Sequence, residues 1–142
     1  MRPAKPASVD HFDIVVSDLA ASLGFYRGLL APLGWTEVTT IEGERGEPVH
    51  YLGGETDRPI SLSLRAAQSP GGTPYDRYAV GIHHIAFAAT SRASVDERHR
   101  WLIEHGAEIE SEPREYDYTE GYYAVFFYDP DGIKLEVLHV PG

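Results

Sequence analysis

Residues 81–90 have the sequence GIHHIAFAAT, and this stretch decides the fold. Bulky and small apolar residues alternate over 85–88, which is the period of a β-strand packed on one face. His84 falls opposite the bulky residues, so we expect it to point away from any helix that covers the strand. The same parity assigns His83 to the packed face and to a structural role.

Residues 10–18, DHFDIVVSD, repeat this pattern near the N-terminus, with His11 and Asp13 opposite the bulky positions. Further along the chain, equivalent residues recur at nearly constant spacing. A period held so closely over strands and helix ends indicates an internal repeat. The spacing is 73 residues from His11 to His84, 72 from Gly34 to Gly106, and 73 from Ser63 to Glu136.

Each repeat predicts one strand, one helix and three further strands, so the chain is expected to be α+β. Ser17 and Asp18 give a helix-start signal, and Gly34 and Gly106 give helix stops. The first repeat predicts strands at 9–17, 35–41, 49–52 and 60–65. The second predicts a helix at 94–105 and strands at 81–90, 107–110, 122–128 and 133–138.

A proline- and glycine-rich stretch near the middle of the chain separates the two repeats. Neither half is large enough to bury a core alone, so we expect one domain formed by both. The predicted organisation is a lead-in at 1–8 and a single domain at 9–142. That domain comprises a first module at 9–66, a linker at 67–80 and a second module at 81–140.

The composition of the chain restricts the kinds of partner that it is expected to bind. The 142 residues include 12 Lys and Arg against 22 Asp and Glu, and the net charge of -10 argues against nucleic acid or an anionic membrane. The absence of cysteine excludes disulfides, thiolate metal sites and cysteine nucleophiles. No signal peptide or membrane span is recognisable, and we expect a cytoplasmic protein with a small-molecule substrate.

Three residues on the unpacked strand faces have the character of metal ligands. Parity places Glu136 opposite the bulky residues of the last strand, as it does His11 and His84 in theirs. Two imidazoles and one carboxylate form a facial triad that leaves positions open on Fe, Mn, Ni, Co or Zn. Taken singly, a histidine in a strand is more often a hydrogen-bonded structural residue, and it is the three residues together that favour a metal site.

Other residues are weaker catalytic candidates. Asp13 shares the ligand face of its strand, and His50 would be a base if its strand faces the cleft. Tyrosines crowd the linker and the segment before 122–128, where they would suit an aromatic ligand. Tyr123 belongs to this group, although a core position is the alternative for Tyr122 or Tyr123.

The residues quoted above, together with FYDPDGIKLE at 127–136, resemble the vicinal oxygen chelate superfamily. This superfamily includes glyoxalase I, extradiol dioxygenases, fosfomycin-resistance enzymes and bleomycin-resistance proteins. The resemblance covers residues 9–140. It implies paired βαβββ modules whose curled mixed sheets form a metal-binding cleft, with His11, His84 and Glu136 as ligands.

The resemblance also implies limits on the activity. A fourth ligand position falls at Ser63, where glyoxalase I has a glutamate that is also its base, so glyoxalase I activity is disfavoured. Extradiol dioxygenases are expected to carry a tyrosine where this chain has Phe126. We therefore expect a metal-dependent lyase or isomerase, then a dioxygenase, in a homodimer. The alternative is a metal-free protein that sequesters a drug or metabolite, as bleomycin-resistance proteins do.

Overall fold

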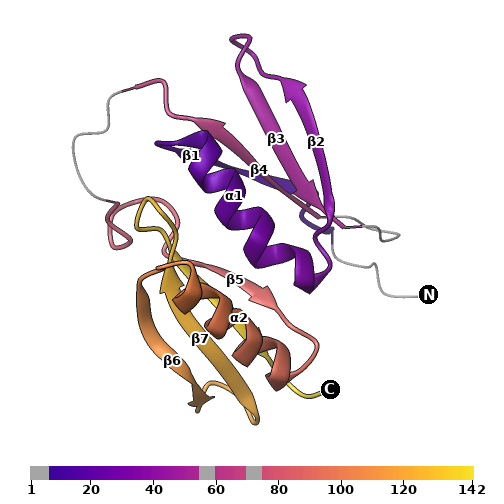
Figure 1. Cartoon of the computed structure of the whole chain (residues 1–142), viewed down its shortest axis with the longest axis vertical. Coiled ribbons are helices and arrows are strands. Elements are labelled where there is room, and N and C mark those ends of the chain that lie inside the picture. The colour runs from indigo at the N-terminus through magenta and orange to yellow at the C-terminus, as the bar shows by residue number, and fades with distance from the viewer. Residues whose placement is uncertain (1–6, 55–59, 70–74) are drawn as a thin grey trace.

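Two four-stranded mixed sheets, each packed against one helix, make up the protein (Figure 1). The computed structural model describes residues 7–54, 60–69 and 75–142. Sheet A contains β1 (His11–Val16), β2 (Glu37–Glu42), β3 (Pro48–Gly53) and β4 (Ser61–Ala66), with helix α1 (Leu19–Leu30) and the short 3₁₀ helix η1 (Ala31–Leu33). Sheet B contains β5 (Ile85–Ala88), β6 (Ile109–Tyr116), β7 (Tyr122–Tyr128) and β8 (Lys134–His139), with helix α2 (Arg92–Glu104).

The two sheets have the same topology. Sheet A has the order β1-β4-β3-β2 and sheet B the order β5-β8-β7-β6, with one parallel pair in each, β1 with β4 and β5 with β8. The predicted repeat of two βαβββ modules is therefore confirmed. In this arrangement β1 and β5 are both edge strands, so each has one side without a ladder partner in its own sheet.

The signals at the helix ends explain where the helices begin and stop. The Asp18 carboxylate accepts a 3.1 Å hydrogen bond from the Ala21 amide, as predicted for the start of α1. Gly34 and Gly106 have φ of 95° and 71°, a left-handed conformation that favours glycine after a helix. Helix α2 begins at Arg92 and not at Ser94, because the Ser91 hydroxyl accepts from the Ser94 amide at 3.1 Å.

One hydrophobic core joins the two modules. It contains Ile14 and Leu62 from sheet A together with Val125 and Leu135 from sheet B. Phe25 of α1 extends this contact, since its ring centroid lies 5.8 Å from that of Trp101 and 6.5 Å from that of Phe127. Burial of these apolar faces against each other stabilises the contact between the two modules.

Strand β6 departs most from the expectation. Its eight residues, Ile109–Tyr116, replace the short strand predicted at 107–110, and Tyr116 belongs to the strand instead of a loop. Its pairing with β7 shifts twice, between Ile109 and Ser111 and between Ser111 and Arg114. Such bulges break the alternation of side chains on which the strand prediction depended.

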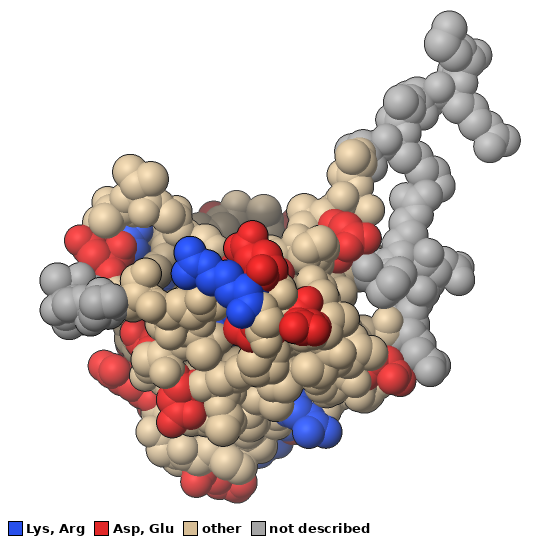
Figure 2. Space-filling model, turned by 90° about the horizontal axis from the view of Figure 1, so that it is seen from above, with Lys and Arg blue, Asp and Glu red and all other residues tan. Residues whose placement is uncertain are grey.

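Acidic side chains are spread over the face shown in Figure 2, in keeping with the net charge of -10. Neither helix of the described residues is long and apolar enough to cross a membrane. Of the predicted lead-in and linker, residues 1–6 and 70–74 lie outside the described part of the chain.

Candidate functional site

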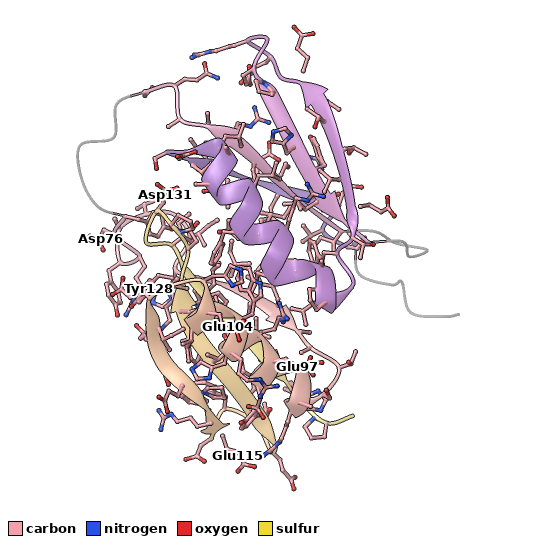
Figure 3. All side chains as sticks on the ribbon, in the orientation of Figure 1. Asp76, Glu97, Glu104, Glu115, Tyr128 and Asp131 are labelled. Atoms are coloured by element: carbon pink, nitrogen blue, oxygen red, sulfur yellow. The ribbon has the colours of Figure 1, made fainter. Side chains whose placement is uncertain are left out.

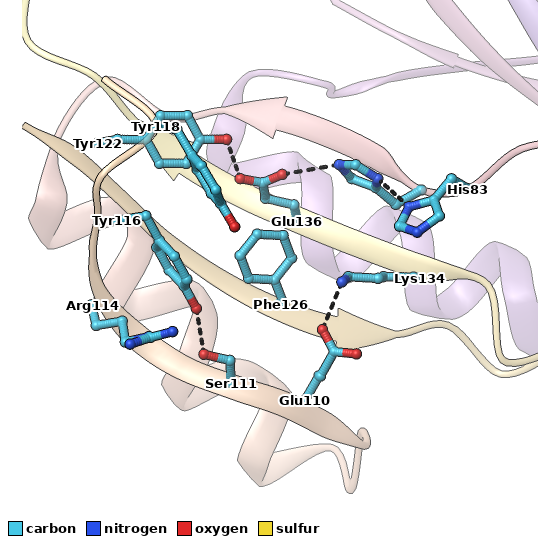
Figure 4. Close-up of a pocket in the computed structure, with 11 residues that line it drawn as sticks. His83, Glu110, Ser111, Arg114, Tyr116, Tyr118, Tyr122, Phe126, Lys134 and Glu136 are labelled. Carbon is cyan, nitrogen blue, oxygen red and sulfur yellow. Dashed lines mark hydrogen bonds and ion pairs between the residues drawn. The ribbon is translucent and has the colours of Figure 1, made fainter. Parts of the chain in front are cut away.

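A pocket of about 470 Å³ lies on the face of sheet B opposite α2, which we call the open face (Figure 4). Strand β8 contributes Lys134 and Glu136, and Phe126 lies beside them on β7. His83 and His84, just before β5, close one side. The pocket therefore contains two of the three predicted metal ligands.

His84 and Glu136 lie close together. His84 Nε2 is 3.3 Å from Glu136 Oε1, and the other oxygen of Glu136 accepts a short hydrogen bond from the Tyr122 hydroxyl. Two donors, each about 2.1 Å from one ion, would be separated by about 3 Å. The spacing of these two side chains fits a shared divalent metal.

The burial of Glu136 gives independent support for a cation here. Its side chain is only 2% exposed. Among the residues that the structure describes, no lysine or arginine lies within 4.0 Å of its carboxylate. A buried carboxylate without a permanent positive partner is costly, so a bound metal ion would compensate for its charge. Tyr122 has its pKa raised, first by burial and then by the hydrogen bond to Glu136.

His83 is a pocket residue, so its predicted place on the packed face is wrong. Strand β5 begins at Ile85, and the alternation of the strand does not extend back to His83. Its Nδ1 lies 2.8 Å from His84 Nδ1, so one ring donates to the other. Desolvation, followed by the charges of His84, Lys134 and Arg77, lowers the pKa of His83.

His11 lies on the other sheet, outside this pocket. Its Nδ1 forms a 2.7 Å contact with Asp10, and its ring packs edge-on against Tyr51 at 5.7 Å. Within the described residues, no three His, Asp or Glu side chains are grouped closely enough to hold one ion. A single chain thus brings together His84 and Glu136 but not His11.

Asp13 and Ser63 share the face of sheet A that carries His11. Ser63 is fully buried, and its hydroxyl donates to Asp13, which also pairs closely with Arg65. Burial raises the pKa of Asp13, but the hydrogen bonds from Ser63 and Arg65 and the charge of Arg65 outweigh it and leave the pKa lowered. Asp13 is therefore held as a carboxylate.

The other two weak candidates lie on faces that the helices cover. His50 pairs in register with Leu64, a core residue, and its Nδ1 lies 2.8 Å from the Thr40 hydroxyl. Tyr123 packs against the core and donates to Asp96 of α2 at 2.7 Å. Neither side chain reaches the pocket.

Residues that the sequence did not single out form the far wall of the pocket. Glu110, Ser111 and Arg114 of β6 line it, together with Tyr116. Glu110, Arg114 and Tyr116 share the parity of one strand face, and the bulge between Ile109 and Ser111 adds Ser111 to that face. The strand predicted at 107–110 was too short to include Arg114. Glu110 pairs with Lys134 at 2.7 Å and Arg77 at 3.1 Å, and these cations overcome desolvation to lower its pKa.

The two ends of sheet B differ in their surroundings. Tyr128 and Asp131 lie at the end nearest the first module, whereas Glu115 lies at the opposite end (Figure 3). The Tyr128 hydroxyl accepts from Arg77 at 2.9 Å and donates to Glu110 at 2.6 Å. This network connects the segment before β5 to β6 and β7 through Glu110, which lines the pocket.

Comparison with known proteins relates this arrangement to a large family. The model of the Glyoxalase/Bleomycin resistance protein/Dioxygenase superfamily matches residues 8–137. The uncharacterized protein YqjT of Bacillus subtilis (strain 168) is 33% identical over 130 residues, covering 90% of this chain and 95% of YqjT.

Solved structures agree. The glyoxalase family protein from Enterococcus faecalis is 29% identical with a TM-score of 0.64, covering 92% of this chain and 96% of that protein. A glyoxylase/bleomycin resistance protein/dioxygenase domain from Frankia sp. EAN1pec has a TM-score of 0.75 at 23% identity, covering 96% of this chain and 100% of that domain. The similarity to the Frankia domain shows that the two proteins have the same fold.

Proposed function

The chain belongs to the Glyoxalase/Bleomycin resistance protein/Dioxygenase superfamily, and from this we propose that it is a divalent-metal-dependent enzyme acting on a small substrate with vicinal oxygens. The observation that carries the proposal is the 3.3 Å approach of His84 Nε2 to Glu136 Oε1 in an open pocket. We favour lyase or isomerase chemistry, with dioxygenase chemistry second.

The proposed metal ligands are His84, Glu136 and His11. When bound, the metal would be Fe, Mn, Ni, Co or Zn and would supply Lewis-acid stabilisation of negative charge on substrate oxygens. His84 can offer Nε2 when its Nδ1 carries the proton and donates to His83. Tyr122 holds the second oxygen of Glu136, which orients the carboxylate toward His84.

We propose that a second copy of the chain supplies His11. Both β1 and β5 are edge strands, and each has a proposed histidine ligand at or just before its first residue. Association of β1 with β5 of another copy would satisfy both edges and bring His11 toward His84 and Glu136. The site would then require a homodimer.

Asp13 is the proposed base, because it lies two residues from His11 on the same face of β1. Its lowered pKa keeps it ionised and ready to accept a proton, although it also makes the carboxylate a weak base. Ser63 occupies the fourth ligand position with a hydroxyl directed at Asp13, so glyoxalase I activity stays disfavoured.

The test is the metal content of purified protein after dialysis against Fe, Mn, Ni, Co and Zn in turn. We expect near-stoichiometric metal in the parent and its loss in His84→Ala and Glu136→Gln. His99→Ala on α2 serves as the matched control and should retain the metal. Absence of metal from the parent in every dialysis would overturn the proposed enzyme.

The second candidate is a metal-free protein that sequesters a ligand. The aromatic lining of the pocket favours it, since Tyr116, Tyr118 and Phe126 could hold a ligand without chemistry. Ligand affinity that is unchanged by a chelator would support this alternative. The cytoplasmic location and the module boundaries expected from the sequence remain predictions.

A further inference from the structure

Aromatic side chains form one continuous wall of the pocket, made of Tyr116, Tyr118, Tyr122 and Phe126 (Figure 4). The rings of Tyr116 and Tyr118 are nearly parallel, 6° apart in plane and 5.2 Å apart at their centroids. Phe126 meets Tyr116 edge-on at 5.3 Å. We call this group the aromatic wall.

One ring of this wall, that of Tyr118, is open to solvent. Tyr118 is 64% exposed, although its ring stacks on Tyr116 and meets Tyr122 edge-on at 5.2 Å. An exposed aromatic ring that continues a half-buried aromatic wall into a pocket is typical of a binding surface. Flat rings arranged in this way best complement another flat ring.

The cations at the pocket differ in whether a carboxylate pairs with them. Lys134 and Arg77 both pair with Glu110, at 2.7 Å and 3.1 Å. Arg114 differs, because no carboxylate of the described residues lies within 4.0 Å of it, and its guanidinium carbon lies 4.2 Å from the centroid of the Tyr116 ring. In a chain with a net charge of -10, this free arginine in the pocket favours an anionic ligand.

The strand register fixes where this cation lies relative to the proposed metal ligands. Glu136 pairs with Phe126, whereas Arg114 pairs with Ala124, which lies two residues along β7 from Phe126. Strands β8 and β6 flank β7, so Glu136 and Arg114 are two strand spacings apart across the sheet and two residues apart along it, about 12 Å between their backbones. Phe126 and Tyr116 occupy the space between. A single ring with substituents at opposite ends fits this span.

We propose that the pocket binds a flat aromatic carboxylate, with its ring on the aromatic wall, its carboxylate at Arg114 and its oxygen substituents directed to His84 and Glu136. This inference deepens the proposed function and rests on it for the role of the oxygens. The ring and carboxylate contacts come from the chain alone, so they are expected without metal.

The test compares two probes, 3,4-dihydroxybenzoate and catechol, which share the two oxygens and differ in the carboxylate. Dissociation constants are measured by NMR titration, first in chelator and then with metal. The parent should prefer 3,4-dihydroxybenzoate at least about tenfold in both states, as expected for a charge-assisted contact with arginine. Arg114→Gln should abolish the preference.

Arg92→Gln is the matched control, because Arg92 also lies over a tyrosine ring, that of Tyr123 at 4.8 Å, but on the other face of sheet B. It should retain the preference. Tyr118→Ala should weaken both probes by a similar factor, and its exposed position makes it safe for folding. Equal affinities for the two probes in the parent, or a preference that survives Arg114→Gln, would overturn the inference.

The design separates this inference from the metal proposal. A protein that binds no metal yet prefers 3,4-dihydroxybenzoate in chelator would refute the enzyme and retain the aromatic carboxylate site. A protein that binds metal through His84 but shows no preference between the two probes would retain the proposed enzyme and refute the aromatic carboxylate site. Failure of both probes to bind, with and without metal, would also refute the site.

Discussion

The hydroxyl of Tyr26, in the first module, donates a 2.7 Å hydrogen bond to Asp129, in the second. Tyr26 is fully buried and Asp129 is 6% exposed, so this contact lies inside the shared core. Asp129 also accepts from the amides of Asp131 and Ile133 at 2.8 and 2.9 Å. The bond therefore connects α1 to the turn between β7 and β8.

We expect Tyr26→Phe to lower the free energy of unfolding by about 1 to 3 kcal/mol at pH 7, because a buried acceptor loses a donor. Burial raises the pKa of Asp129 above 3.8 and the Tyr26 bond partly offsets this, so the variant should raise it further. The folded variant then binds more protons, and its deficit should shrink as the pH falls. Chemical denaturation of the parent and the variant at pH 7 and pH 4 measures the difference in their unfolding free energies. A difference that is larger at pH 4 than at pH 7 would contradict the prediction.

Arg98 stabilises the end of α1. Its guanidinium, 7% exposed, donates to the carbonyl oxygens of Gly28 and Leu29 at 3.0 and 3.3 Å. Carbonyl groups in the last turn of a helix lack intrahelical partners. We expect Arg98→Met to cost about 2 kcal/mol of unfolding free energy. The control is Arg100→Met, exposed on the same helix, and similar losses in the two variants would refute this role.

Tyr122 is expected to position Glu136 for metal binding. Tyr122→Phe removes the hydroxyl that holds one oxygen of Glu136, and we expect metal affinity to fall about 10- to 100-fold. The adjacent Tyr123→Phe is the control, since its hydroxyl faces α2. Competition with a chromophoric chelator measures the metal affinity of both variants. An unchanged affinity in Tyr122→Phe would show that Glu136 needs no such support.

Mixing two defective chains tests the shared site. His11→Ala and His84→Ala should each fail to bind metal as pure proteins. Refolded together, they should regain part of the metal, because a mixed dimer pairs the intact His11 of one copy with the intact His84 and Glu136 of the other. If each site were formed within one chain, mixing would restore nothing. Metal analysis of the mixture after gel filtration distinguishes a site shared between two copies from a site formed within one chain.

Ser63 should control the ionisation of Asp13. Ser63→Ala removes one hydrogen bond to the carboxylate, so the lowered pKa of Asp13 should move up toward 3.8. A lowered folded-state pKa contributes stability above the unfolded pKa, and that stability is lost as the pH falls through the folded value. The variant should therefore lose less stability on acidification below about pH 4. NMR titration of Asp13 measures the pKa, with Ser61→Ala on the same strand face as the control.

Much of the fold could be predicted from local signals. The Asp18 cap and the two helix-ending glycines, Gly34 and Gly106, act through contacts within a few residues. The spacing that relates Ser63 to Glu136 places both on equivalent strands, β4 and β8. Alternation also assigns Glu136 to the open face, because β8 is regular along its whole length.

The candidate site was only partly predictable. Alternation failed at His83, because β5 starts after it. Arg114 was missed for another reason, because the strand was predicted to end at residue 110 and β6 extends to Tyr116. Whether His50 and Tyr123 face the open side was likewise undetermined, since a helix covers one face of each sheet only in the folded chain.

The sequence by itself determined the repeat and the strand and helix order, and it nominated the residues proposed to bind metal, because these depend on side-chain identity and short-range periodicity. Only the tertiary structure decided that His84 meets Glu136, that His11 lies on a separate sheet, and that Arg114 faces the aromatic wall. Those relationships depend on strand register and on which apolar faces pack together. Both are set by contacts between residues far apart in the chain.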